Sequence, residues 1–444
     1  KGALEEMLAV SNYVEYKDEI IPLTDQVRED VLAEVAQLNE QGLRVLGVSY
    51  KSNLEEGYAF EVADEADMIL TGYLAFLDPP KPSAAPAIQA LLEHGVRTKI
   101  LTGDNEKVTQ AICEKVGLDV EHMLLGADID QMTDQELAEA VEKVTVFAKL
   151  SPDQKARIIL QLKRNGHVVG YMGDGINDAP SMKVADVGIS VDTAVDIAKE
   201  TADVILLDKD LMVLETGIVE GRKVYANMTK YIKMTVSSNF GNIFSLLVAS
   251  IFLPFLPMAP VHLIVLNLVY DLSCVALPFD NVDQDFLKQP HTWEAKSITR
   301  FMVWMGPISS IFDILTFIFL YFIIVPLVTG YHYVHGSESA LQFIIFFQTG
   351  WFIESMWSQT MVIHMLRTAK VPFVQSRPAW LVILMTLVAA FFVTSLPYGP
   401  LVHILRLAPL GLPYFLFLIC IIFLYMFSVT VIKKCYIRKY KEWL

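Results

Sequence analysis

Two carboxylates stand close together in the segment 173–178, which reads Gly-Asp-Gly-Ile-Asn-Asp. The segment follows an apolar run at 168–172 that we expect to be a strand. Asp174 and Asp178 are four residues apart on the turn from this strand to a helix, where they could share one divalent cation. The glycines let the backbone approach a phosphate closely. Mg²⁺ prefers a few carboxylates, water and phosphate oxygens. The segment therefore predicts a magnesium and phosphate site rather than a solvated acidic turn.

Two further segments carry groups that suit phosphate chemistry. Thr102-Gly103-Asp104 closes a predicted strand at 98–101, and its hydroxyl and backbone N–H groups could hold a phosphoryl oxygen. Lys155 lies on a helix opened by 151–153 (Ser-Pro-Asp), a good start signal. A fixed ammonium near a transferring phosphate neutralises developing charge. Taken alone, the segment 102–104 is better explained as an ordinary turn, and Lys155 as a lysine exposed to solvent. The prediction rests on all three segments lying, in order, at strand ends of one sheet.

Three acids, Asp271, Asp313 and Glu354, lie well inside apolar runs of the second half of the chain. Ionisable residues inside a membrane are costly and mark ion pathways. Asn267 and Asp271 are four residues apart and so share one face of a helix. We expect Asp271 to be a buried carboxylate that grips a travelling ion. For Asp313, a hydrogen bond between helices is an equally good explanation.

The elements that must position the phosphate-handling residues alternate between strand and helix. The patterns predict strands at 43–50, 74–78, 98–101, 144–147, 168–172, 187–190 and 204–206, and helices at 28–41, 84–94, 105–116 and 152–163. Such alternation predicts an α/β domain, a Rossmann-like parallel sheet with helices on both faces. Such sheets bind ligands just past the carboxyl ends of their strands.

Six apolar runs follow Arg222, each close to the roughly 20 residues that a helix needs to cross a bilayer. They lie at about 230–254, 259–279, 300–328, 340–364, 379–398 and 411–432. Lysines and arginines gather before the first run, after the sixth, and in every second connection. By the positive-inside rule, both ends of the chain are expected in the cytoplasm. The second half is therefore expected to be an all-α transmembrane domain of six helices in the lipid bilayer.

Charge divides the chain into the same two halves. Of the 50 Asp and Glu residues, 41 lie in residues 1–222, and the second half is sparsely charged and slightly basic. No basic stripe with interleaved aromatic residues is present, so a nucleic-acid partner is not expected. The 4 cysteines are scattered without metal-ligand spacing or a disulfide pattern.

Taken together, these motifs resemble those of P-type ATPases, whose phosphorylation domain belongs to the haloacid dehalogenase superfamily. Four segments carry the resemblance in the correct order: the hinge Asp78-Pro79-Pro80-Lys81, the turn Thr102-Gly103-Asp104, the lysine segment 147–155 and the magnesium motif 173–178. Lys1-Gly2-Ala3 and 42–45 (Gly-Leu-Arg-Val) resemble nucleotide-domain segments. The likeness covers the whole chain.

The resemblance implies a role for each residue. Thr102, with Gly103 and Asp104, would hold a phosphoryl group whose charge Lys155 balances. The catalytic Mg²⁺ would bind Asp174, with Asn177 and Asp178 in support. Lys1 and Arg44 would contact ATP. The family's nucleophilic aspartate, in an Asp-Lys-Thr-Gly-Thr segment, is not in this sequence.

The resemblance also implies an organisation. Residues 1–75 would be part of an α+β nucleotide-binding domain, 76–222 a phosphorylation domain without its first strand, and 223–444 the transmembrane domain. The chain opens without an initiator Met, and we expect it to be the carboxyl-terminal part of a multi-pass pump of the inner membrane. Its partners would be the rest of that pump, namely the actuator domain and the first four membrane helices.

The transported ion is expected to be Mg²⁺. The segments 267–281 and 354–367 resemble those of bacterial magnesium-transporting ATPases of the Mgt type, which import Mg²⁺. Side chains at the positions of cation ligands are Asn239, Asn242, Asn267, Asp271 and Glu354. Asn242 replaces a carboxylate of calcium pumps, and a sparser oxygen site suits Mg²⁺ better than Ca²⁺. Three alternatives stay open: a pump for another cation such as Ca²⁺, a membrane-anchored phosphatase of the same superfamily, and a non-catalytic fragment that binds an intact pump.

The class of protein can be tested on the gene itself. We expect codons for an Asp-Lys-Thr-Gly-Thr segment upstream of Lys1, because the three phosphate-handling segments need a nucleophile. Sequencing the upstream reading frame checks this, and a frame without that segment would favour the phosphatase or the non-catalytic fragment.

Overall fold

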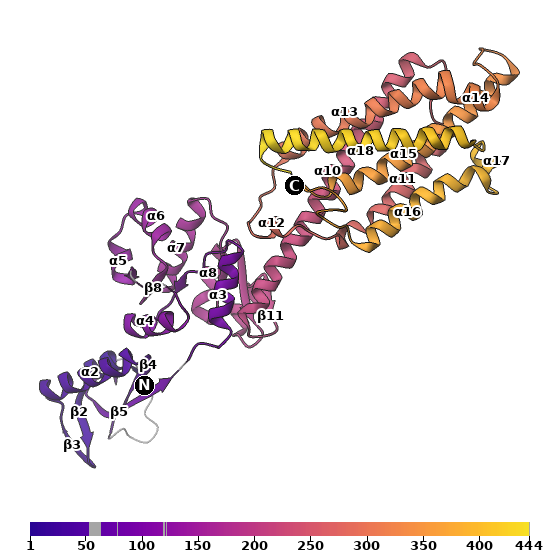
Figure 1. The fold of residues 1–444 in the computed structure, drawn as a ribbon. Coiled ribbons are helices and arrows are strands. Elements are labelled where there is room, and N and C mark those ends of the chain that lie inside the picture. The colour runs from indigo at the N-terminus through magenta and orange to yellow at the C-terminus, as the bar shows by residue number, and fades with distance from the viewer. Residues whose placement is uncertain (53–63, 78, 119, 121, 444) are drawn as a thin grey trace. The chain divides into compact units, whose positions relative to one another are not determined.

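The computed structural model describes residues 1–52, 64–77, 79–118, 120 and 122–443. The chain forms two compact units, Lys1–Gly217 and Ile218–Leu444. Figure 1 shows short strands with helices in the first unit and long helices in the second. Asp78 of the predicted hinge lies outside the described residues.

A five-stranded sheet opens the first unit, in the order β1-β4-β5-β2-β3. Its strands are β1 (Gly2–Ala3), β2 (Ser11–Tyr16), β3 (Glu19–Pro22), β4 (Leu43–Tyr50) and β5 (Met68–Leu77), with helices α1 (Leu4–Val10) and α2 (Asp25–Glu40). Leu4, Leu8 and Val35 of the helices pack with Leu70 in one core. The predicted strand at 43–50 matches β4. Gly42, with a φ of 81°, ends α2 and leads into β4 because glycine adopts positive φ without strain.

Two three-stranded parallel sheets make up the rest of the first unit. Their orders are β11-β10-β9 and β6-β8-β7. The strands are β6 (Ile100–Leu101), β7 (Met123–Leu125), β8 (Val146–Ala148), β9 (Gly170–Met172), β10 (Val187–Val191) and β11 (Val204–Leu206). The helices are α3 (Ala84–Glu93), α4 (Glu106–Lys115), α5 (Gly126–Gln131), α6 (Asp134–Lys143), α7 (Pro152–Arg164), α8 (Ala179–Val184), α9 (Asp196–Thr201) and the 3₁₀ turn η2 (Ile176–Asp178).

The expectation of one continuous sheet is therefore wrong for the described strands. β6 and β9 are edge strands, and no described strand pairs with their second edges. Leu101 at the end of β6 and Val169 just before β9 nevertheless pack against the same two clusters of buried residues. These clusters contain Ile158 and Ile159 of α7, so this helix joins the two sheets.

Local signals fix both ends of α7. Ser151 and Gln154 form a reciprocal capping box, and Pro152 occupies the first turn. Lys163 and Arg164 lie in the last turn, where positive charge is favoured. The side chain of Gln154 also donates to the Gly126 carbonyl oxygen at 3.0 Å. The capped start holds Lys155, in the first turn, at a defined place.

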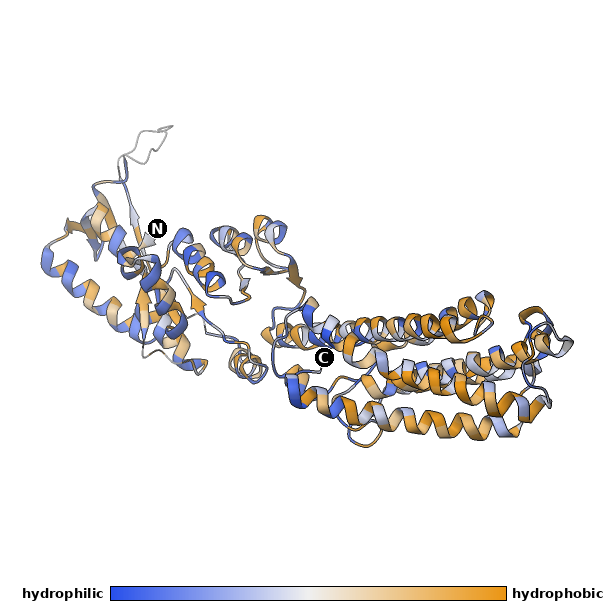
Figure 2. Cartoon of the chain, turned by 90° about the horizontal axis from the view of Figure 1, so that it is seen from above, coloured by the Kyte–Doolittle hydropathy of each residue, from blue (hydrophilic) through white to orange (hydrophobic). Residues whose placement is uncertain are grey.

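Long helices form the second unit. They are α10 (Leu211–Phe252), α11 (Pro260–Cys274), α13 (Ala295–Phe319), α15 (Glu338–Leu366), α16 (Trp380–Ser395) and α18 (Leu412–Tyr440). Shorter pieces are η3 (Leu277–Phe279), α12 (Gln284–Leu287), η4 (Leu320–Ile324), α14 (Val325–Thr329), η5 (Leu396–Tyr398) and α17 (Val402–Leu405). Figure 2 shows hydrophobic residues along most of the length of the long helices.

Five helical segments of the described residues are long and apolar enough to cross a membrane. They are Leu211–Phe252, Pro260–Phe279, Ala295–Thr329, Trp380–Tyr398 and Leu412–Tyr440. The sixth predicted run, 340–364, is also helical, as α15, but it is not one of these five. Its apolar residues are interrupted by Gln348, Glu354, Gln359 and several hydroxyl side chains. The count of six spans is thus not confirmed.

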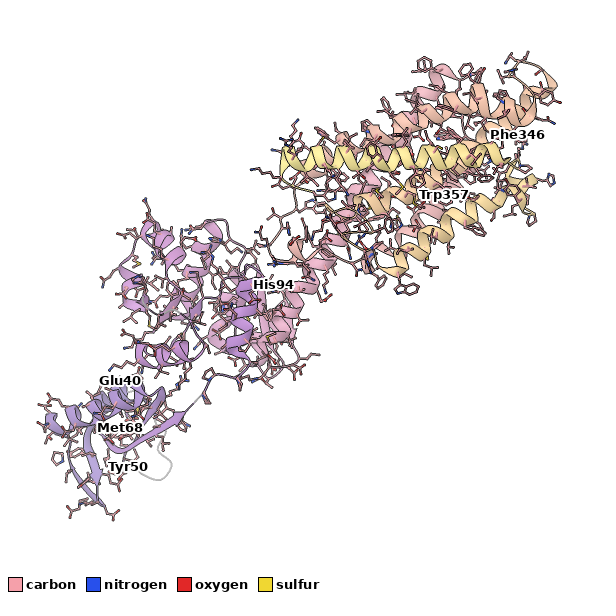
Figure 3. The ribbon with its side chains drawn as sticks, in the orientation of Figure 1. Glu40, Tyr50, Met68, His94, Phe346 and Trp357 are labelled. Carbon is pink, nitrogen blue, oxygen red and sulfur yellow. The ribbon has the colours of Figure 1, made fainter. Side chains whose placement is uncertain are left out.

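The α15 helix is the most buried of the long helices. Phe343, Phe347, Phe352 and Met356 are fully buried, and the helix packs against α11, α13, α16 and α18. The indole of Trp357, labelled in Figure 3, donates to Thr394 of α16 at 2.9 Å. A helix that is covered over most of its length by other helices can carry polar residues that lipid would exclude.

A buried ion network closes one end of the helical unit. Asp280 accepts from Lys230 Nζ at 2.9 Å and from Arg367 Nε at 2.7 Å, and the three side chains are at most 1% exposed. The Ala379 N–H donates to the other carboxylate oxygen at 3.1 Å. The network thus ties α10, the loop after η3, the end of α15 and the start of α16 together.

We expect Asp280→Asn to destabilise the helical unit by about 3–5 kcal/mol, because it leaves two buried cations without their shared anion. The free energy of unfolding of the full-length protein, measured by detergent titration in mixed micelles, checks this. Asp285→Asn is the matched control, since Asp285 pairs with Lys370 at the surface. Equal stability of both variants would contradict the role given to Asp280.

Candidate active site and ion-binding site

Asp178 is the best-connected side chain of the predicted phosphate site. Its Oδ1 accepts from Lys155 Nζ at 3.0 Å and from the Tyr171 hydroxyl at 2.7 Å. Its Oδ2 accepts from the Gly175 N–H at 3.2 Å. The site therefore joins the first turn of α7, strand β9 and the 3₁₀ turn η2 through one carboxylate.

The surroundings keep Asp178 ionised. Burial would raise the pKa of its carboxyl group, but the hydrogen bonds from Tyr171 and Lys155 outweigh burial and hold the pKa below its usual value. Burial, and then the hydrogen bond to Asp178, raise the pKa of Tyr171 well above its usual value. At neutral pH a carboxylate, a phenol and an ammonium group thus meet at this point.

Gly173 must be glycine for this arrangement to form. A Cβ atom on Gly173 would lie 2.4 Å from the Cβ of Asp178, which is far inside contact distance. The Gly173 N–H donates to the Ile189 carbonyl oxygen at 3.1 Å, and the Ser190 hydroxyl donates to the Gly173 carbonyl oxygen at 3.0 Å. Strand β10 therefore holds the end of β9 in place, and the small residue lets η2 fold back against it.

The turn 102–104 is tied to the segment that leads into α7. The Thr102 hydroxyl donates to Asp104 Oδ2 at 3.2 Å, and the Asp104 N–H donates to the Thr102 hydroxyl oxygen at 3.1 Å. The Leu150 N–H donates to the Thr102 carbonyl oxygen at 3.0 Å, and the Lys149 N–H to the Asp104 carbonyl oxygen at 2.9 Å. These bonds place the turn beside the start of α7, which carries Lys155.

An open cleft of about 520 Å³ lies where these segments meet, a volume typical of ligand pockets. Its lining consists of Arg44, Gly103, Asp104, Leu150, Pro152, Lys155, Gly175, Ile176, Asn177 and Asp178. Arg44 Nη2 pairs with Asp104 Oδ1 at 3.1 Å across it. Of the nine predicted phosphate-site and nucleotide residues, six line the cleft, whereas Thr102, Asp174 and Lys1 do not.

Asp174, which is next to the lining residue Gly175 in the sequence, and Asn177, which lines the cleft, have exposed side chains. The Asp174 carboxylate has no hydrogen bond or ion pair within the described ranges. No group of three or more His, Cys, Asp or Glu residues suited to a metal ion occurs there either. These residues fit Mg²⁺, because that ion takes one or two carboxylates and completes its shell with water and phosphate.

The predicted cation ligands of the helical unit fall into two groups. Asn239, Asn267 and Asp271 are exposed, Asn242 is half-buried, and Glu354 is buried. Asn267 and Asp271 share one face of α11, as their spacing predicts, but the expectation of a buried Asp271 is wrong for this chain. The helix α11 instead packs its opposite face, which carries Leu266, Val269, Tyr270, Ser273 and Cys274, against the other helices.

Trp351 and Ser245 were not among the predicted site residues. The Trp351 indole and the Ser245 hydroxyl both donate to Asp313, whose carboxyl group lies beside that of Glu354. Trp351 stands three residues before Glu354 and hence on the same helix face, a spacing that could have indicated its place. Nothing in the spacing of Ser245 indicates its contact.

The sequence matches three family descriptions over consecutive parts. Residues 1–83 match the P-type ATPase cytoplasmic domain N, 49–186 the haloacid dehalogenase-like hydrolases, and 255–435 the cation-transporting ATPase C-terminus. The chain is 49% identical over 440 residues to the magnesium-transporting ATPase, P-type 1, of Escherichia coli (strain K12), covering 99% of this chain and 48% of that protein.

Other relatives that the chain matches are also named as cation-transporting ATPases. The Salmonella typhimurium (strain 14028s) protein of the same name is 50% identical over 99% of this chain and 48% of its own length. The calcium-transporting ATPase of Bacillus subtilis is 32% identical over 72% of this chain and 37% of its own length. The chain thus spans about half the length of the curated relatives it matches. It belongs to the P-type ATPases.

Proposed function

We propose that this chain is the carboxyl-terminal part of an ATP-driven pump that moves Mg²⁺ into the cytoplasm through an aspartyl phosphate. One observation carries the proposal: Lys155, Asp178 and Asp104 converge on one cleft at the carboxyl ends of parallel strands, in a chain whose other unit has five helices fit to span a membrane. The similarity to magnesium-transporting relatives supports the choice of ion.

The cleft suits a phosphoryl group because its charged side chains are already held in place before that group binds. The Lys155 ammonium is held 3.0 Å from Asp178 at the capped start of α7, so it can balance phosphoryl charge without moving far. The Thr102 hydroxyl, which donates to Asp104 in this structure, would turn and donate to a phosphoryl oxygen. Arg44, which lines the cleft, and Lys1 would contact ATP.

Asp174, Asn177 and Asp178 would hold the catalytic Mg²⁺. When bound, that ion neutralises the charge of the transferred phosphate. The Asp174 carboxylate is exposed and has no side-chain partner among the described residues, so it is the group most available to bind this ion. Asp178 is already bound to Lys155 and Tyr171, so its part is to fix the motif and the lysine rather than to supply the first ligand.

The nucleophile would come from the rest of the protein, with the actuator domain and the first four membrane helices. Edge strands β6 and β9 each offer one unpaired side among the described strands. One parallel strand between them would complete the sheet, and a residue just past its carboxyl end would lie beside Thr102 and Asp174. This supports the proposed assignment of 76–222 to a phosphorylation domain without its first strand, between a nucleotide-binding part (1–75) and a transmembrane domain (223–444).

The exposed face of α11 supports a cation path shared with further helices. Asn267 and Asp271 lie on that face among Ile264, Leu268 and Leu272, which are also exposed. A carboxylate facing lipid is costly, so we propose that the remaining membrane helices cover it. With Asn239, Asn242 and Glu354, these residues would provide oxygen ligands. By the distribution of Lys and Arg, both ends of the chain would lie in the cytoplasm and the pump in the inner membrane.

Asp174→Ala in the full-length protein is expected to abolish phosphoenzyme formation, because the variant loses the free carboxylate proposed for the catalytic Mg²⁺. Incorporation of radiolabelled phosphate from ATP, measured after an acid quench, checks this. Asp196→Ala removes a carboxylate that is 93% exposed and serves as the control. Phosphorylation of the Asp174 variant at the unaltered level would rule out the assigned role.

Asp271→Asn is expected to leave ATP binding intact and to remove cation-dependent ATP hydrolysis, because the cation loses its anionic ligand on α11. Nucleotide binding and ATPase activity against Mg²⁺, Ca²⁺ and monovalent ions, measured in proteoliposomes, check both halves. Asp285→Asn is the matched control. Normal transport by the Asp271 variant would refute the proposed cation site. If only Ca²⁺ stimulates ATP hydrolysis by the unaltered protein, the transported ion is Ca²⁺ and not Mg²⁺.

A further inference from the structure

Two carboxyl groups are buried side by side in the helical unit, on α13 and α15. Asp313 is 4% exposed and Glu354 is 1% exposed. Asp313 accepts from the Ser245 hydroxyl at 2.6 Å through Oδ2 and from the Trp351 indole at 2.9 Å through Oδ1. Glu354 lies within hydrogen-bonding reach of Asp313, yet its Oε2 has no partner in the described part of the chain.

Among the described residues, no basic side chain pairs with either of these two carboxyl groups. The salt bridges of the described residues include neither Asp313 nor Glu354. The other ionisable groups that face them are the phenols of Tyr414 and Tyr425 on α18, which carry no charge at neutral pH. Two buried carboxylates without a counter-charge are very costly. Such a pair is stable only when it holds a cation or a proton.

A small cavity with a mixed lining adjoins Asp313. It measures about 20 Å³ and lies between α10, α13, α15 and α18. Its lining has a polar part, Ser237, Ser238, Asn242, Ser309, Asp313, Ser358, Gln359 and Tyr425, and an apolar part, Met234, Met305, Val362 and Leu366. The space exceeds the roughly 10–15 Å³ needed for one water-sized particle. A single ion or water therefore fits, and a larger solute does not.

The lining has the chemistry of a hard-cation site. It offers one carboxylate and several hydroxyl and amide groups, which are the oxygen ligands that Mg²⁺ and Ca²⁺ take. One of its oxygen atoms, the Ser237 hydroxyl, also lacks a hydrogen-bond partner among the described atoms. Buried polar groups are normally paired, so an unpaired hydroxyl in the wall of a cavity points to a bound species.

We propose that Asp313 and this cavity form a second position for the transported divalent cation, with Glu354 as the neighbouring carboxylate. This inference rests on the proposed function and extends it: Asn242 and Glu354 are already proposed there as cation ligands, and Asp313 with the cavity is the addition. The position lies in the interior between α10, α13, α15 and α18, whereas Asn267 and Asp271 lie on the exposed face of α11. A cation would thus have a site formed wholly by this chain.

The test uses the full-length protein with Asp174→Ala as the parent, so that the proposed catalytic magnesium site does not contribute. Mn²⁺ is the probe, because its free concentration is measured directly by electron paramagnetic resonance and it prefers oxygen ligands. Adding Asp313→Asn is expected to weaken Mn²⁺ binding by about tenfold or more. Added Mg²⁺ should displace Mn²⁺ from the parent.

Asp313→Asn keeps the shape of the side chain. Its Oδ1 can accept from Trp351, and its amide can donate to the Ser245 hydroxyl, which can turn. Gln359→Met provides a second variant of the same cavity, should the first fail to fold, and is expected to weaken Mn²⁺ binding several-fold. Asp285→Asn is the matched surface control and should bind Mn²⁺ like the parent.

The outcomes are distinct. Weaker binding in the cavity variants with an unchanged control supports the site. Parent-like binding in either folded variant overturns the site and leaves the proposed pump intact, since Asp271 could still serve it. A shared proton instead of a cation would show as parent-like Mn²⁺ binding. If the parent itself binds no Mn²⁺ that Mg²⁺ displaces, both the proposed substrate and the second position fail.

Discussion

The ion pair between Lys155 and Asp178 is the interaction on which the proposed phosphate site depends. It joins a helix that follows one parallel sheet to a turn that follows the other. Both side chains are largely buried, so a missing partner would leave an uncompensated charge at the centre of the site. Tyr171 and the Gly175 N–H complete the shell of the carboxylate. Gly103, Asp104 and Asn177 of the motifs line the same cleft as this pair.

Local sequence signals predicted much of this arrangement. The capping residues around Ser151 set the start of α7, and Gly42 set the end of α2. The motif 173–178 lies on a strand-to-turn junction, as expected, because Gly173 is required wherever the backbone turns back on Asp178. Such features depend on neighbours in the sequence, which is why patterns predicted them.

Several features that depend on distant partners were not predicted. The single sheet became two because no described strand fills the edge between β6 and β9. Asp271 was expected to be buried, yet the packed face of α11 is the opposite one. The contact of Ser245 with Asp313 also arises only from the fold. Helical spacing fixes which residues share a face, but not which face is covered.

In the proposed function, a phosphoryl group lies between Thr102 and Lys155, and Mg²⁺ binds Asp174. A structure of the full-length protein with Mg²⁺ and beryllium fluoride, a phosphoryl mimic, tests this most directly. We predict fluoride within hydrogen-bonding distance of the Thr102 hydroxyl and the Lys155 ammonium, and Mg²⁺ bound to the Asp174 carboxylate. A mimic bound away from these groups, or Mg²⁺ bound without Asp174, would contradict the account.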